Sequence, residues 1–166
     1  TLGELHPDAL RKLRHLFVDE TRVRVIEGDG YHLLRSELPP VEKRGLVHID
    51  PPFESKSEFE AMTAALQEGY RRFATGVYAL WYPIKGGLEV KRFHKALVAS
   101  GIRKILCAEL LVHPDDVGQR LNGSGMILVN PPWQLADQLR TLLPWIHKRL
   151  APNGQGGARI QWLVGE

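Results

Sequence analysis

Apolar and polar residues follow one another along this chain with two different spacings, which alternate. Short apolar runs rich in β-branched and aromatic residues favour strands. Stretches with apolar residues three and four positions apart favour amphipathic helices. The pattern predicts strands over residues 22–26, 46–49, 77–82, 103–112, 126–129 and 158–164, and helices over residues 7–17, 31–38, 57–75, 88–100 and 131–150. The chain therefore alternates strands with helices.

Several local signals set the expected boundaries of these elements. Pro7 suits the first position of a helix. Residues 57–60 have the spacing of a capping box, which opens the third helix, and Gly76 ends it. The glycine-rich segment 122–125 predicts a flexible turn, and Pro131 begins the last helix. These signals agree with the periodicity.

The alternation is typical of a doubly wound α/β sheet with helices on both faces. Long strands near the C-terminal end indicate an antiparallel addition, so we expect a mixed but mostly parallel sheet. A chain of 166 residues suits one core, and we expect residues 1–166 to form a single domain.

Composition narrows the class of protein. Hydrophobic residues make up 43% of the chain and charged residues 25%, as in an ordinary globular domain, and no apolar run is long enough to span a membrane. Cys107 is the only cysteine, which excludes an internal disulfide and points to the cytoplasm. No group of cysteines and histidines has zinc-site spacing, so we expect no metal. The net charge of +3 favours polyanionic partners only slightly.

Acidic residues stand where ligands are expected to bind. In open α/β sheets, ligands bind beyond the carboxyl ends of the strands. Asp29 follows the strand at 22–26 and Asp50 follows the strand at 46–49, while Glu4 precedes the first helix. Each has an ordinary alternative, such as a helix start or a turn. Their recurrence along one sheet edge makes a binding site the better interpretation.

The sharpest local signal is the segment Asp50-Pro51-Pro52-Phe53. Its two prolines stiffen the chain and leave backbone carbonyls free to accept hydrogen bonds. The Asp50 carboxylate and the Pro51 carbonyl could accept the two N–H groups of an exocyclic amine, while Phe53 stacks on the base. That arrangement would expose the amine nitrogen for attack on an electrophilic methyl group, with positioning supplying most of the acceleration.

A second segment, Asn130-Pro131-Pro132-Trp133, has the same form. Enough chain follows Asp50 to supply the later strands of a methyltransferase sheet, and too little follows Asn130. We therefore assign the catalytic turn to Asp50 and expect the Asn130 turn to be a structural helix start.

These motifs, taken in order, closely resemble the bacterial RlmJ family, whose members methylate an adenine N6 in large-subunit (23S) ribosomal RNA. The resemblance covers essentially the whole chain. It rests on residues 4–7, 29–30, 38–40, 44–45, 50–54, 73–76, 78–83, 123–126 and 130–133.

The resemblance implies a Rossmann-like class I methyltransferase fold and S-adenosylmethionine as methyl donor. By position, Glu4 matches the acidic residue that holds the cofactor ribose, and Asp29 with Gly30 matches the contact to the cofactor adenine. Asp50 matches the catalytic aspartate, which also borders the cofactor. Phe53, together with Pro51, completes the base site, although the family usually carries tyrosine at that position. We add Tyr82 as a possible substrate contact.

The largest departure from the family pattern lies at the front of the sequence. Family members carry a first strand with a glycine-containing cofactor loop, and a helical insertion, before the segment that matches residues 4–7, and this sequence lacks both. We therefore expect a sheet without its first strand, and weak binding of the methyl donor by this chain alone. A cytoplasmic monomer acting on 23S ribosomal RNA is expected. A DNA adenine-N6 methyltransferase and a non-catalytic RNA-binding module remain alternatives.

Overall fold

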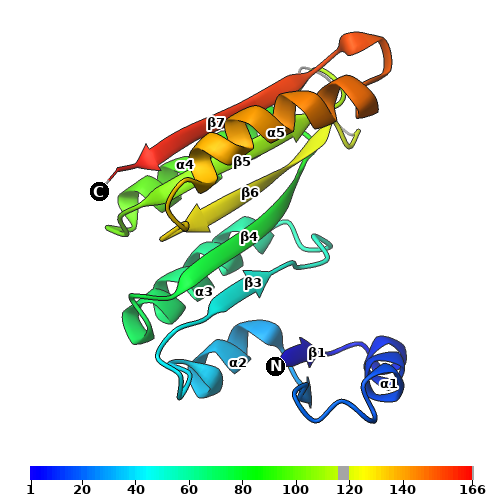
Figure 1. Cartoon of the computed structure of the whole chain (residues 1–166), viewed down its shortest axis with the longest axis vertical. Helices are drawn as coiled ribbons and strands as arrows, with labels where there is room; N and C mark the ends of the chain where they lie inside the picture. Colours follow the sequence, from blue (N-terminus) through cyan, green and yellow to red (C-terminus); the bar gives the residue numbers. More distant parts are fainter. Residues whose placement is uncertain (116–119, 166) are drawn as a thin grey trace.

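The computed structural model of the chain describes residues 1–115 and 120–165. Its N-terminal part contains a small parallel pair of strands. Strand β1 (Leu2–Glu4) pairs with β2 (Val25–Glu27), and helix α1 (Pro7–Leu16) connects them. Helix α2 (Gly30–Glu37) follows β2 directly. Figure 1 shows this part at the blue end of the chain, beside the larger sheet.

The larger sheet holds the remaining described strands in the order β3-β4-β6-β5-β7. Strand β3 (Leu46–Ile49) runs parallel to β4 (Val77–Ile84), whereas every later pair is antiparallel. The other members are β5 (Ile105–Leu111), β6 (Gly123–Val129) and β7 (Gly157–Val164). The sheet is therefore mixed, as expected, but most of its described pairs are antiparallel, so the prediction of a mostly parallel sheet was wrong.

Helices cover both faces of this sheet, as the sequence indicated (Figure 1). Helices α3 (Glu58–Arg72) and α4 (Gly87–Ala99) lie on one face and contribute buried residues to the main core. Helix α5 (Leu135–Leu150) lies on the other face against β5 and β7, and a short 3-10 helix (Pro152–Gly154) follows it. The core thus lies between the sheet and the α3–α4 layer.

The differences between the predicted and observed elements include two boundaries and one strand that was not predicted. Segment 122–125 was expected to be a turn, but Gly123 and Gly125 lie inside β6, where they permit close approach by neighbouring strands. Pro83 was expected to end its strand, yet β4 continues through it to Ile84. Strand β1 was not predicted, because three residues carry no periodic signal.

Helices α1 to α4 begin within one residue of their predicted starts, but α5 begins at Leu135 and not at Pro131, because Gln134 just before it has a left-handed backbone with φ of 69°. Helix α1 has Pro7 at its start, and helix α3 begins at Glu58, one residue after Ser57. Ser57 makes no side-chain capping bond, so the expected capping box does not form. Within the described part of the chain, no helix is long and apolar enough to cross a membrane.

Candidate functional site

A cleft of about 1440 Å³ separates the two sheets. One wall comes from β1 and the start of α2, and the other comes from β3 and the loop after it. In the described structure β1 pairs only with β2, and β3 pairs only with β4. Both strands therefore present an unpaired edge to the cleft. Its volume exceeds the 300–1,000 Å³ or so that is usual for a small-molecule pocket.

Glu4 ends β1 and lines this cleft. Its Oε1 atom accepts hydrogen bonds from the backbone amides of Leu5 (2.8 Å) and His6 (2.7 Å). These bonds hold the carboxylate at the carboxyl end of the strand, just before α1. Among the described residues no hydrogen bond to Oε2 is recorded, so one oxygen remains available to a ligand hydroxyl.

Asp29 and Gly30 line the same cleft one strand further along. Asp29 is the N-cap of α2, and its Oδ1 accepts a hydrogen bond from the Tyr31 amide at 2.8 Å. A Cβ atom built on Gly30 would meet nothing within 4 Å. The backbone at Gly30 is therefore open to the cleft, and a planar group could approach it closely.

Asp50 and Pro51 form the opposite wall. Ile49, the last residue of β3, is buried, whereas Asp50 is exposed and lies at the carboxyl end of the strand. The structure thus brings Glu4, Asp29 and Asp50 to one cleft. Asp29 and Asp50 were expected at this edge because each follows a predicted strand, whereas the strand that ends at Glu4 was not predicted.

Phe53 lies beside this wall in a left-handed backbone conformation, with φ of 53°. Its ring packs edge-on against Phe59 (centroids 5.1 Å apart) and Trp81 (6.0 Å). Two neighbouring aromatic rings, one from α3 and one from β4, therefore fix the orientation of Phe53. The side chain is half-buried and packs against the main core, and Phe53 is not among the residues that line the cleft.

A hydrogen bond ties the two sides of the cleft together. The Tyr31 hydroxyl on α2 donates to Oε1 of Glu58 on α3 at 2.7 Å. Glu58 is one of the few buried charged residues in the described chain. Burial, and then the bond to Glu58, raise the pKa of Tyr31, so its hydroxyl stays protonated. Sequence reasoning missed this contact because the two residues belong to different helices.

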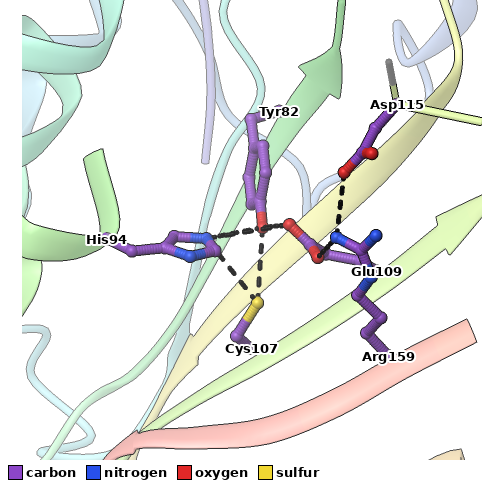
Figure 2. A network of polar contacts seen from close by, with 6 residues as sticks. All are labelled: Tyr82, His94, Cys107, Glu109, Asp115 and Arg159. Carbon is purple, nitrogen blue, oxygen red and sulfur yellow. Dashed lines mark hydrogen bonds and ion pairs between the residues drawn. The ribbon is translucent and has the colours of Figure 1, made fainter. Parts of the chain in front are cut away.

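Tyr82 does not lie where the sequence placed it. Its side chain is fully buried, and its hydroxyl points into a polar cluster with His94, Cys107 and Glu109 (Figure 2). A substrate in the cleft could not reach it without rearrangement, so the structure gives no support to the expected substrate contact. Trp81, the preceding residue, is the part of β4 that faces Phe53.

Asn130 lies at the opposite end of the sheet from Asp50. Strand β6 runs antiparallel to β4, so Asn130 follows the end that pairs with Tyr78 near the beginning of β4. Its Nδ2 donates to the carbonyls of Ala74 and Gly76, both at 2.8 Å. Asn130 thus holds the loop before β4, which agrees with a structural role for the second turn.

Comparisons with known proteins point to one family. A family model described as "Ribosomal RNA large subunit methyltransferase D, RlmJ" matches residues 1–164. Two curated relatives, each described as "Ribosomal RNA large subunit methyltransferase J", come from Escherichia coli (48% identical over 165 residues) and Haemophilus influenzae (45% identical). In both cases the alignment covers 99% of this chain and 59% of the relative.

A solved structure is also similar. The crystal structure of a Legionella pneumophila protein, assigned to a family model named DUF519, superposes with a TM-score of 0.82 at 28% identity. The match covers 99% of this chain and 60% of that protein. The chain therefore spans about three-fifths of the length of the proteins it matches.

Proposed function

The chain belongs to the RlmJ family of large-subunit ribosomal RNA methyltransferases, and on that premise we propose that it carries the base-binding part of an adenine-N6 methyltransferase. The observation that carries the proposal is the position of Asp50 and Pro51. They follow a buried strand and line the same cleft as Glu4 and Asp29. Base groups and cofactor groups would then meet at one place.

In the proposed reaction, an adenine enters beside Phe53 and stacks on its ring. The Asp50 carboxylate and the Pro51 carbonyl accept the two N6 hydrogens, which orients the nitrogen lone pair out of the ring plane. Positioning and electrostatic stabilisation of the developing positive charge supply the acceleration. A stacked or paired adenine must first be turned out to reach this position.

The residues of the other wall fit S-adenosylmethionine, which supplies an activated methyl group when bound. The free Glu4 oxygen suits ribose hydroxyls, because a carboxylate accepts hydrogen bonds from them. The open backbone at Gly30, beside the Asp29 cap, suits a planar purine. Both features hold the nucleoside half of the donor, and we assign no described residue to its methionine half.

The shape of the cleft explains why no described residue is assigned to the methionine half of the donor. Strands β1 and β3 each belong to a parallel pair and each turn an unpaired edge toward the cleft. In the described structure they do not pair with each other. We propose that one further strand, from a segment outside residues 1–166, completes the sheet between them and holds the methionine half. The chain alone should therefore bind S-adenosylmethionine weakly. Isothermal titration calorimetry showing tight one-to-one binding by residues 1–166 would contradict this.

The substrate is proposed to be large-subunit ribosomal RNA, because the curated relatives carry that substrate in their names. The test uses the complete natural protein that contains this chain, with radiolabelled methyl donor and equal amounts of unmodified large-subunit RNA and duplex DNA. Label in the adenine N6 of RNA alone supports the proposal. Label in DNA would favour a DNA methyltransferase, and RNA binding without transfer would favour a non-catalytic module.

A further inference from the structure

A buried polar cluster lies away from the cleft, inside the layer between the sheet and α4. The Tyr82 hydroxyl lies 3.0 Å from Nε2 of His94, 3.4 Å from Sγ of Cys107 and 2.9 Å from Oε1 of Glu109. Nε2 of His94 is 3.7 Å from Sγ and 3.8 Å from Oε1. Figure 2 shows the four side chains pointing toward one another from β4, α4 and β5.

We propose that this cluster is a binding site for a zinc-type divalent metal ion, with His94, Cys107 and Glu109 as ligands and the Tyr82 oxygen in the fourth position. The proposal does not rest on methyl transfer. It uses only residues outside the cleft.

The spacing of the four atoms fits a tetrahedral ion. Zinc–ligand bonds of about 2.0–2.3 Å place neighbouring ligands of a tetrahedral site about 3.3–3.8 Å apart. The ligand atoms of His94, Cys107 and Glu109 all lie within 4.8 Å of one another. The Tyr82 hydroxyl lies 2.9 and 3.0 Å from Glu109 and His94, slightly closer than in a tetrahedral site, and 3.4 Å from Cys107, within that range. A small outward shift of the hydroxyl would therefore suffice.

The sheet register explains why these residues meet. Tyr82 on β4 and Glu109 on β5 both pair with Gly125, which lies between them on β6. A Cβ atom at Gly125 would lie 2.1 Å from the Tyr82 ring. The ring therefore crosses β6 only because residue 125 is glycine, and this brings its hydroxyl to Glu109.

The donor set suits a borderline metal ion rather than calcium or magnesium, because it combines thiol sulfur, imidazole nitrogen and carboxylate oxygen. The side chains of Cys107, Glu109 and Tyr82 are 0–3% exposed, so the cluster is almost closed to water. His94 is 14% exposed, so a metal ion could enter the cluster from its side.

The surroundings hold the ligands in place. Arg159 on β7 lies opposite Glu109 in the register and places its guanidinium 3.8 Å from Oε2, leaving Oε1 to the cluster. Asp115 holds that guanidinium at 3.1 Å. Metal binding breaks the S–H bond of Cys107 and forms a sulfur–metal bond, so one proton leaves to solvent for each ion bound.

Cobalt(II) is the probe, because a tetrahedral thiolate site gives it a sulfur-to-metal charge-transfer band and intense visible bands. The reduced chain, without a histidine tag, is titrated with cobalt(II) and then with zinc(II). We expect one cobalt per chain, a charge-transfer band, and loss of both bands when zinc displaces the cobalt. Absence of any cobalt spectrum at a large excess of metal would overturn the proposal.

Variants locate the site. Cys107→Ser should remove the charge-transfer band, and His94→Ala should weaken cobalt binding about tenfold or more. His15→Ala, which removes an exposed histidine from α1, is the matched control and should change neither. A charge-transfer band that survives Cys107→Ser would contradict the assignment. Circular dichroism checks that each variant is folded. If Cys107→Ser does not fold, Glu109→Gln replaces it as the test, and it should also weaken cobalt binding.

Discussion

Tyr31 on α2 and Glu58 on α3 share a hydrogen bond of 2.7 Å. Tyr31 lies in the first turn of α2, next to the Asp29 cap, and Glu58 begins α3 after the Asp50 loop. The bond therefore joins the proposed cofactor wall to the proposed base wall. Because Glu58 is buried, the loss of its partner leaves a carboxylate poorly satisfied.

Replacing Tyr31 with phenylalanine should lower the free energy of unfolding by about 1–2 kcal/mol, because the bond to a charged acceptor is lost with little change in packing. Urea denaturation measures the effect. Tyr70→Phe on α3 is the matched control, since no hydrogen bond of the Tyr70 hydroxyl is recorded in the described structure, and it should change stability by less than about 0.5 kcal/mol. Equal losses in the two variants would contradict the importance of the bond.

Gly125 is required for a second contact, the passage of the Tyr82 ring across β6. Gly125→Ala should destabilise the protein by about 1–3 kcal/mol, because the new methyl group would overlap a ring fixed by its hydroxyl. Gly165→Ala is the control, since a Cβ there meets nothing within 4 Å. Thermal unfolding followed by circular dichroism compares the two. A Gly125→Ala protein as stable as the control would show that the ring can move aside.

Cys107 should be inert in the folded protein. Burial is the main cause that raises the pKa of its thiol to about 12, so the reactive thiolate is absent near neutral pH. In the unfolded chain the thiol has its ordinary pKa of about 9. The free energy of unfolding should therefore fall as the pH rises from about 9 toward 12, because the unfolded thiol loses its proton first. Mass spectrometry after iodoacetamide treatment at pH 8, with chelator present, should find modification only in urea. Rapid modification of the native chain would contradict the burial.

Local signals predicted most of the helices and the positions of the acidic residues. Pro7 marked the start of α1, and the position of Asp50 after an apolar strand placed it at the cleft. These features depend on neighbours in sequence, so one sequence suffices to find them. The direction of the C-terminal strands was harder, because register and orientation arise from contacts between segments far apart in the chain.

The buried cluster could not be found in this way. His94 comes from a helix and Cys107 and Glu109 from a strand, with spacings that match no metal motif. Only the register across Gly125 brings Tyr82 to them. Tyr82 was expected near the substrate because it lies near the end of the strand beside the predicted base site, but its side chain points into the core.

Asn130 should matter for stability and not for chemistry. Asn130→Ala removes two hydrogen bonds to the loop before β4 and leaves alanine at a positive φ of 51°, so we expect a loss of about 2 kcal/mol. Asn130→Gly should lose less free energy of unfolding than Asn130→Ala, because glycine tolerates the positive φ although the two hydrogen bonds are still missing. Asp50→Ala changes an exposed side chain and should alter stability by less than about 0.5 kcal/mol. Urea denaturation of the three variants tests this order.

The most direct test compares methyl transfer by Asp50→Ala and Asn130→Ala in the complete natural protein, on unmodified large-subunit RNA, at a temperature where both are folded. We predict that Asp50→Ala lowers the single-turnover rate roughly 100-fold or more, because a group that stabilises the transition state is lost. The Asn130→Ala protein should keep a rate close to that of the unchanged protein. A normal rate for Asp50→Ala, or a comparable loss for Asn130→Ala, would contradict the assignment of the catalytic turn.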